Sequence, residues 1–204
     1  AINTLYYIVG TVPTRMVIAL ALAILVNRSM KGVAFVRASF YLPSIVSTVA
    51  ISFVWLWMYD PVSGFFNGIL QALGLSAQPW LTSPDTSMLS IIIMALWRNV
   101  GYCMVLFLAG LQGIPSHLYE AATIDGAEGW QKFRYVTLPL LKPTSLFVFY
   151  VSTLSAFRIF EEVFIMTRGG SEFAGGPNNS TVVMALEIYR TGFWYNEFGM
   201  ASAM

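Results

Sequence analysis

The chain is poor in charge, cysteine and histidine. Of its 204 residues, 57% are hydrophobic and only 10% are charged, and there is one Cys and one His. Soluble domains carry about 25% charged residues, so this composition indicates a membrane protein. A single thiol excludes a disulfide framework within the chain, and one Cys with one His cannot build a zinc site. We expect Cys103 to be a small core residue and His117 to lie on the surface near a helix start.

Catalytic motifs are also missing. The sequence contains no nucleotide-binding loop of the form G-x-x-x-x-G-K-[ST] and no H-E-x-x-H, so we predict that the chain itself does not hydrolyse ATP. Glu161 and Glu162 suggest acid–base chemistry, but nothing near them supplies a nucleophile. The net charge of +1 comes without a basic cluster that would suggest nucleic acid binding. Energy for any work must therefore come from a partner, unless the process runs downhill.

Long apolar runs dominate what is present. A helix needs about 20 residues to cross a bilayer, and four stretches reach that length, at residues 5–26, 35–59, 88–111 and 144–167. A fifth begins near Phe198. We predict one transmembrane domain over residues 1–204, an all-α helical bundle. We expect it to be truncated, with a span before residue 1 and the end of the last span missing.

Basic residues predict the orientation. Arg28 and Lys31 follow the first span, and the stretch before the fourth span carries Lys132, Arg134 and Lys142, whereas residues 60–85 contain no Lys or Arg. By the positive-inside rule, the first loop and residues 114–143 are cytoplasmic. Residues 60–85 and 168–196 then lie outside.

Local features of the spans and loops give further predictions. Pro43 is expected to kink the second span, and GGSEFAGGPNNS, at residues 169–180, is typical of a flexible connection. We interpret the rings near the outer ends of the spans as membrane-interface anchors, with sugar stacking as the alternative. These rings are Trp55, Trp57, Tyr59, Trp194 and Tyr195.

Charges inside the predicted spans are the second notable feature. A central Arg costs at least ~2.5–3.5 kcal/mol on insertion scales, so each should face the bundle or a wet cavity. Arg158 lies three and four residues before Glu161 and Glu162, which predicts ion pairs on one helix face. Arg15 and Arg98 lie at depths that also allow pairing across helices.

These charges have two interpretations. They are structural ion pairs, or they line a translocation cavity in which neighbours supply hydrogen bonds and stacking surface. Three Arg against two Glu leave one positive charge, which suggests a substrate of anionic character. The candidate pathway residues are Arg98, Asn99, Tyr102, Phe157, Arg158, Phe160 and Glu161.

A polar stretch, YEAATIDGAEGWQKFRYVTLPLLKP, separates the third and fourth spans at residues 119–143. It predicts a helix over about residues 116–125 that ends at Gly126, and a second over about 127–138 that is stopped by Pro139. Ala121, Ala122 and Gly126 leave one side almost bare, so another protein surface could approach closely.

EAATIDGA, followed by WQKF and VTLPLLKP, resembles the EAA loop of binding-protein-dependent ABC importer permeases of the sugar branch, the maltose-type and glycerol-phosphate-type permeases. The NTLYY, FYLP and FLAGLQGIP runs, at residues 3–7, 40–43 and 107–115, are similar to that branch as well. The resemblance covers nearly the whole chain. Arg15 departs from it, since an apolar residue is expected there.

The resemblance implies a type I ABC importer permease fold whose EAA loop, residues 114–143, forms coupling helices. Carried over by position, the joint with a cytoplasmic ATPase subunit would consist of Glu120, Ala121, Ala122, Asp125 and Gly126. The implied partners are two ATPase subunits, which hold ATP and Mg, a second permease chain that is a different polypeptide, and an external solute-binding protein. The implied location is a bacterial or archaeal cytoplasmic membrane.

The function implied is a permease subunit that translocates a sugar, oligosaccharide or related polyol. Two alternatives stay open from the residues alone: a secondary carrier driven by an ion gradient, and a permease for a sugar-phosphate-like anionic solute. A structural membrane subunit without its own pathway is a third. Dependence of uptake on a proton or sodium gradient would separate the first alternative from the ABC importer.

Overall fold

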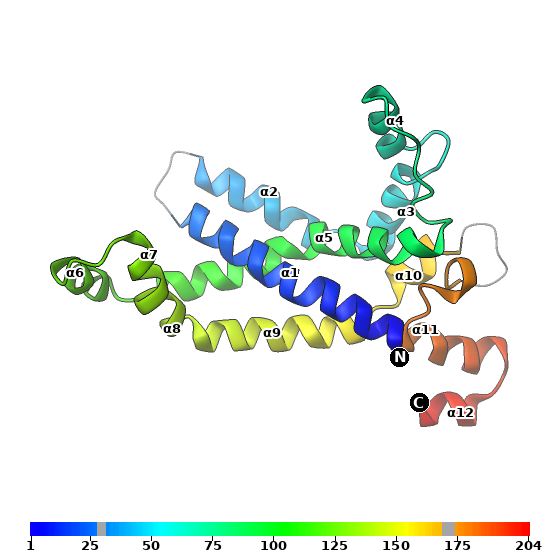
Figure 1. Ribbon diagram of the computed structural model, residues 1–204. Helices are drawn as coiled ribbons and strands as arrows, with labels where there is room; N and C mark the ends of the chain where they lie inside the picture. Colours follow the sequence, from blue (N-terminus) through cyan, green and yellow to red (C-terminus); the bar gives the residue numbers. More distant parts are fainter. Residues whose placement is uncertain (28–31, 169–173) are drawn as a thin grey trace. The chain divides into compact units, whose positions relative to one another are not determined.

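The computed structural model describes residues 1–27, 32–168 and 174–204, and every regular element in these ranges is a helix (Figure 1). Arg28, Lys31 and the first part of the Gly-rich stretch, residues 169–173, lie outside the described residues. The α-helices are α1 (Ile2–Val26), α2 (Val33–Ile45), α3 (Thr48–Met58), α4 (Phe65–Ala72), α5 (Pro84–Gln112), α6 (Ser116–Ile124), α7 (Gly129–Lys132), α8 (Leu138–Leu140), α9 (Lys142–Phe157), α10 (Glu161–Met166), α11 (Met184–Tyr189) and α12 (Phe198–Ala203). Short η helices are η1 (Phe133–Thr137), η2 (Pro177–Asn179) and η3 (Arg190–Trp194).

The described chain forms two compact units. Unit 1 consists of Ala1–Thr11, Val46–Leu96 and Leu154–Met204, and unit 2 of Val12–Ile45 and Trp97–Thr153. The long helices α1, α5 and α9 contribute residues to both.

The predicted spans correspond to helices, but two of the four are interrupted. Helices α1 and α5 are long and apolar enough to cross a membrane by themselves. The stretch 35–59 is instead divided between α2 and α3 by Val46 and Ser47, three residues after Pro43. The stretch 144–167 is divided between α9 and α10 by residues 158–160. The predicted spans 35–59 and 144–167 are thus each divided between two helices, the first of them shortly after Pro43, where a kink was expected.

Unit 2 is built on a tightly packed apolar core. Buried residues of α1, α5 and α9 form it, including Ala19, Ala23, Met104, Phe107 and Val148. Cys103 belongs to the same core, as expected from its lone thiol, and its Sγ lies 3.6 Å from the hydroxyl of Ser152. Since lipid is as apolar as these side chains, close packing rather than water exclusion holds such helices together.

Two glycines of α5 make this close packing feasible. A Cβ on Gly101 would overlap the carbonyl oxygen of Phe40 in α2, so the two backbones are in direct contact. A Cβ on Gly110 would come within 2.6 Å of the hydroxyl oxygen of Thr144 in α9. Small residues at such crossings allow the approach that membrane helices use for van der Waals packing.

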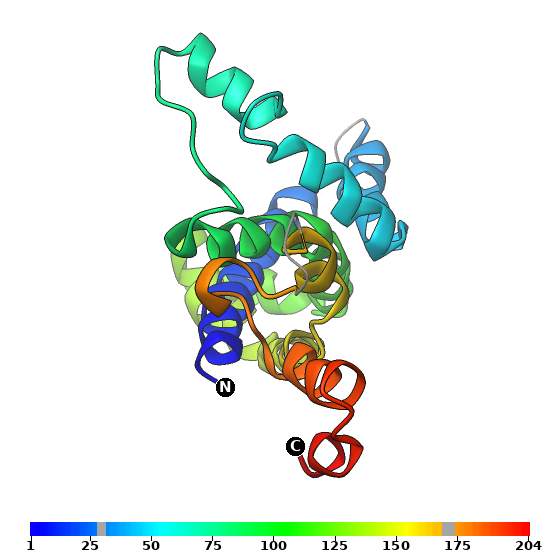
Figure 2. The ribbon, with the colours of Figure 1, turned by 90° about the vertical axis from the view of Figure 1, so that its right-hand side faces the viewer.

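Unit 1 consists of shorter elements. Helix α10 packs against α3, and α4 extends from the loop that follows α3. Helices α11 and α12 lie next to each other, joined through the π-helical turn η3 (Figure 2). Trp55 and Tyr59 are buried in an aromatic cluster with Phe66 and Trp80. They are therefore packing residues, and the interpretation of these two rings as membrane-interface anchors is wrong.

Candidate functional site: a polar loop and a broken helix

Helix α6 matches the first helix predicted in the polar stretch. It covers Ser116–Ile124, within one residue of the expected end, and its first residue follows Pro115, which has an extended backbone. His117 is exposed in its first turn, as expected for a surface histidine.

The end of α6 is fixed by Gly126, which has φ +78°. The amide of Ala127 donates to the carbonyl of Ala122 at 2.8 Å, and the amide of Gly126 donates to that of Thr123 at 3.0 Å. This pair of bonds is the Schellman motif, and its left-handed residue is usually glycine because a Cβ is disfavoured there. The predicted stop at Gly126 is confirmed.

The second helix of this loop differs from the prediction. It begins at α7 with a capping box between Glu128 and Gln131, passes through the π-helical turn η1, and continues through α8 to Leu140. Pro139 therefore does not stop it. Proline is tolerated because it sits in the first turn of α8, directly after the π-helical turn, where a missing N–H costs little.

A side-chain contact ties α6 to this second helix. The hydroxyl groups of Tyr119 and Thr137 are 3.0 Å apart, and Thr137 is buried. The α7–α8 helix then meets α9 at a bend of 64°.

The outward surface of α6 is open. Glu120, Ala121 and Asp125 are exposed, and so is Gly126, which has no atom within 4 Å of an added Cβ. Large apolar groups share this exposure: Ile124 is 87% accessible and the nearby Trp130 is 72% accessible. Exposed apolar side chains beside small residues and carboxylates are typical of a protein interaction surface.

The break between α9 and α10 is the second candidate site. Helix α9 ends at Phe157, Phe160 has non-helical angles (φ −142°, ψ −58°), and α10 begins at Glu161. Arg158 thus lies outside both helices, and the predicted helix face shared by Arg158 with Glu161 or Glu162 is wrong. The sequence periodicity could not reveal this because it assumes that the helix continues.

An interrupted helix at membrane depth leaves unpaired backbone groups. Such backbone is tolerated only where it is buried in protein or lines a water-filled cavity. Ile159 is buried within the break, whereas Phe157 and Arg158 are exposed. Phe160 stacks on Phe164 with ring centroids 5.3 Å apart, and it lines a cavity of about 440 Å³ with residues of α11, η3 and α12.

The candidate pathway residues fall into two groups. Arg98, Asn99 and Tyr102 lie on α5 in unit 2, with Tyr102 exposed and the other two partly buried. The remaining four, from the end of α9 and the start of α10, belong to unit 1. Their convergence on one path stays a prediction.

Arg15 is the most buried of the predicted intramembrane charges. It lies on α1 in unit 2 and is 3% accessible. Its Nε atom has no hydrogen-bond partner among the described residues. Because a buried arginine in an apolar span is costly without a partner, this residue is a functional candidate.

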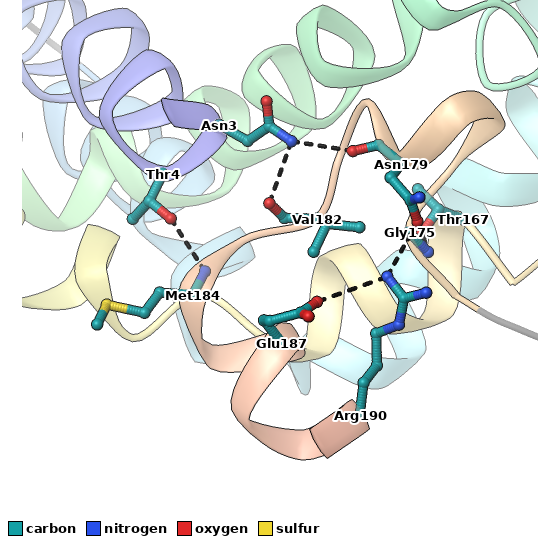
Figure 3. A network of polar contacts seen from close by, with 9 residues as sticks. All are labelled: Asn3, Thr4, Thr167, Gly175, Asn179, Val182, Met184, Glu187 and Arg190. Carbon is teal, nitrogen blue, oxygen red and sulfur yellow. Dashed lines mark hydrogen bonds and ion pairs between the residues drawn. The ribbon is translucent and has the colours of Figure 1, made fainter. Parts of the chain in front are cut away.

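A polar network in unit 1 was not predicted (Figure 3). Asn3 Nδ2 donates to the carbonyls of Asn179 and Val182 at 3.0 and 3.1 Å, and the hydroxyl of Thr4 accepts from the amide of Met184 at 3.0 Å. These bonds fix the start of α1 to a segment about 180 residues later in the chain. Asn3 and Thr4, at the start of the NTLYY run, are the polar residues that could have indicated this network. Their partners could not be identified from the sequence.

The same network holds the described part of the Gly-rich stretch. The Gly175 amide donates to the Thr167 hydroxyl at 2.9 Å, and Arg190 Nη1 lies 3.0 Å from Asn179 Oδ1 and 3.6 Å from Glu187 Oε2 (Figure 3). For residues 174–180, the expectation of a flexible connection is therefore wrong, because side chains distant in sequence satisfy their backbone.

Removing Arg190 should loosen this network locally. The Arg190→Met change keeps much of the buried stem but leaves Asn179 and Glu187 without the guanidinium, at a cost of about 1–3 kcal/mol. Amide hydrogen exchange of residues 174–184 should accelerate by about tenfold or more, since 1.36 kcal/mol corresponds to a factor of ten. Arg168→Met is the control, because Arg168 is exposed and, within the part of the chain that the structure describes, it lies over the Phe164 ring. Equal exchange in the two variants would contradict this assignment.

Residues 8–201 match the model of one protein family, described as the binding-protein-dependent transport system inner membrane component. The chain belongs to this family. The resemblance inferred from the EAA loop is confirmed, and so is the prediction of a multi-pass inner-membrane transport component.

The similarity to individual proteins agrees with this family assignment. The chain is 36% identical to the trehalose/maltose transport system permease protein MalF of Thermococcus litoralis, over 92% of this chain and 61% of that protein. It is 38% identical to the lactose transport system permease protein LacF of Rhizobium radiobacter, over 94% of this chain and 63% of that protein. The chain thus spans somewhat less than two thirds of the length of these relatives.

A solved structure confirms the fold class. The model superposes with a TM-score of 0.87 on a chain of a bacterial ABC transporter involved in the import of the acidic polysaccharide alginate. The sequence identity is 26%, and the match covers 98% of this chain and 69% of the other. The all-helical permease fold predicted from sequence is therefore confirmed.

Proposed function

We propose that this chain forms the membrane-spanning part of a permease subunit in an ATP-driven importer. Its substrate is a sugar, an oligosaccharide or a related polyol, delivered by an external solute-binding protein. Membership of the family and the carbohydrate transport named for its relatives support this assignment. An ion-gradient-driven carrier is disfavoured for the same reason.

The observation that carries the proposal is the exposed α6, closed at Gly126 and flanked by uncovered Ile124 and Trp130. We assign α6 as a coupling helix that docks on a cytoplasmic ATPase subunit. The small Ala121 and Ala122 allow close docking, and Glu120 and Asp125 can meet basic groups. The EAA loop is then cytoplasmic, as the positive-inside rule predicts.

The full assembly in this proposal has two permease chains, of which this is one and a different polypeptide the other. It also has two ATPase subunits, which hold ATP and Mg, and the solute-binding protein. A similar solved chain belongs to an alginate transporter that has been seen with its periplasmic protein carrying an alginate pentasaccharide. Closure of the ATPase pair would draw the coupling helices together and switch the spans between inward- and outward-facing arrangements.

The broken segment between α9 and α10 supplies the substrate path in this proposal. Phe157, Phe160 and Tyr102 offer ring faces, while Asn99, Arg98, Arg158 and Glu161 offer hydrogen bonds. Irregular backbone at this point is consistent with a water-lined path, since lipid would not tolerate it.

A second candidate substrate class is favoured by Arg15. This arginine is buried with an unpartnered Nε, and the structurally similar alginate transporter handles an acidic polysaccharide. A sugar carrying an anionic group would offer the compensating charge.

The test uses the complete full-length importer with its binding protein, and measures ATPase stimulation by neutral and acidic oligosaccharides. Stimulation by at least one carbohydrate is expected, while dependence of uptake on a proton or sodium gradient would contradict the proposal. Arg15→Leu, Arg98→Leu and Arg158→Leu variants that still assemble then separate the substrate classes. Unchanged selectivity in all three excludes the anionic substrate.

A further inference from the structure

A second cavity in unit 1 lies away from the broken helix. It has a volume of about 710 Å³ and lies between the C-terminal end of α3, the loops on both sides of α4, and the residues Met166, Thr167, Gly176 and Pro177. Its lining includes Trp57, Asp60, Ser63, Trp80 and Thr82. On the predicted topology these residues face the outside, and the volume falls within the range of small-molecule sites.

One wall of this cavity is rigid. Asn67 in α4 is fully buried, and its amide donates to the carbonyls of Pro61 and Gln78, both at 3.1 Å. Its Oδ1 accepts from the Gln78 amide at 2.9 Å and from Trp80 Nε1 at 3.0 Å. The loop that carries Trp80 is thus held in place by hydrogen bonds from one buried side chain of α4.

Trp57 differs from the other aromatic residues of this region. Trp80 stacks with Tyr59 and Phe66 in the buried cluster. Trp57 is 61% accessible, and its side chain makes no ring contact or hydrogen bond with the described residues. A large flat apolar face with a spare indole donor therefore borders the cavity.

Asp60 supplies a fixed negative charge next to that ring. Its Oδ1 accepts from the amides of Val62 and Ser63 and from the Ser63 hydroxyl, at 3.0, 2.7 and 3.0 Å. These hydrogen bonds, led by the Ser63 amide, lower the pKa of Asp60, so the carboxylate stays ionised at neutral pH. Its Oδ2 has no partner among the described residues and is left to accept from a ligand.

We propose that this cavity is a second saccharide subsite, separate from the broken helix, which binds a neutral pyranose unit with its ring on Trp57 and its hydroxyl groups on Asp60 Oδ2 and the Thr82 hydroxyl. The proposal rests on the proposed carbohydrate import. It assigns the cavity to an early step, in which part of an oligosaccharide is held outside the membrane-embedded path.

The charges around the cavity select the ligand class. Among the described residues that line it there is no Lys or Arg, and Asp60 is the one ionised group. An acidic sugar or a lipid phosphate would meet a carboxylate without a compensating cation. A neutral sugar ring instead offers hydroxyl donors to the carboxylate and a face of C–H groups to the indole. The ring and the carboxylate would also suit a quaternary ammonium group, and the experiment includes that ligand.

The test measures binding of maltotriose, a neutral trisaccharide, to the complete full-length importer in lipid nanodiscs, without the binding protein or sugar-based detergents. Trp57→Leu and Asp60→Asn are each expected to raise the Kd about tenfold. The asparagine at position 60 keeps an oxygen that accepts the hydrogen bonds from Val62 and Ser63, but it removes the negative charge. The matched controls are Val54→Ala, an exposed residue of α3 outside the lining, and Asp85→Asn, the other carboxylate of the same predicted loop. Both should bind as the unaltered protein does.

The results of this binding experiment can be distinguished from the results of the test of the proposed function. Absence of maltotriose binding, or equal Kd values in all variants, overturns the subsite even if ATPase stimulation by sugars is intact. Tighter binding of choline or of an alginate trisaccharide than of maltotriose overturns the neutral-sugar assignment. Tenfold weaker binding in both pocket variants, with unchanged controls, establishes the subsite whether or not uptake of the tested sugar is observed.

Discussion

Replacement of Gly126 with Leu is expected to abolish substrate-stimulated ATP hydrolysis and transport while the chain still inserts in the membrane. Gly126 has φ +78° and closes α6 with a Schellman motif. A side chain there disfavours the left-handed conformation by roughly 1–2 kcal/mol. Because an added Cβ would meet no atom of the described residues within 4 Å, a bulky group would project into space that the proposed ATPase occupies. ATPase stimulation should fall by about tenfold or more.

The chain offers a matched control for this variant. Gly74 follows α4 with φ +75°, and an added Cβ there also meets nothing within 4 Å. The Leu75 amide donates to Leu70 and the Gly74 amide to Gln71, which reproduces the same helix-ending motif. Gly74→Leu carries the same backbone strain on the predicted outer side, so coupling should persist. Full transport by Gly126→Leu, or equal losses in the two variants, would refute the coupling assignment for α6.

Gly101→Ala should cause the largest loss of stability among the glycines of α5. Its Cβ would overlap the carbonyl oxygen of Phe40, a backbone atom that cannot rotate away. Separation of α2 from α5 would sacrifice packing along their contact, at a cost of about 3 kcal/mol or more. The gain of about 0.5–1 kcal/mol from replacing a helical glycine with alanine is too small to offset this.

A graded series tests the steric explanation. Gly110→Ala meets side-chain atoms of Thr144 and Leu141 at 2.6 and 2.9 Å, which can shift, so its loss should be intermediate. Gly113→Ala meets its nearest atom, a carbonyl oxygen, at 3.5 Å and should change the stability by less than about 0.5 kcal/mol. Thermal unfolding of the full-length protein in detergent gives the order. A loss for Gly101→Ala no larger than that for Gly110→Ala or Gly113→Ala would contradict the close approach of α2 and α5.

Sequence reasoning succeeded where a single local rule determines the structure. Apolar length located α1 and α5, and glycine chemistry located the end of α6 at Gly126. The bare side of α6 was predicted because Ala121 and Ala122 need no tertiary partner to be small. Family membership followed from the same stretch, since its order of small, acidic and proline residues is specific.

Long-range contacts account for most of the wrong predictions. The helix break consists of Arg158, Ile159 and Phe160, and none of them is a helix breaker, so periodicity alone favoured a continuous span. Residues 174–180 were interpreted as flexible because Gly and Asn are common in loops, but Asn3 and Arg190 fix them from other parts of the chain. Trp55 and Trp57 have the same local pattern, yet Trp55 is buried and Trp57 is exposed, because Tyr59 and Phe66 pack against Trp55.

The π-helical turn η1, Phe133–Thr137, lies within the helix that connects α6 to α9. A π-turn contains one residue more than an α-helical turn, so it resembles an insertion that the helix has absorbed. Deletion of one residue there would rotate every preceding position by about 100° and shift it by about 1.5 Å relative to α9. Glu120 and Asp125 would then face a different direction without any change to α6 itself. The length of this segment therefore sets the direction in which the exposed face of α6 points relative to α9.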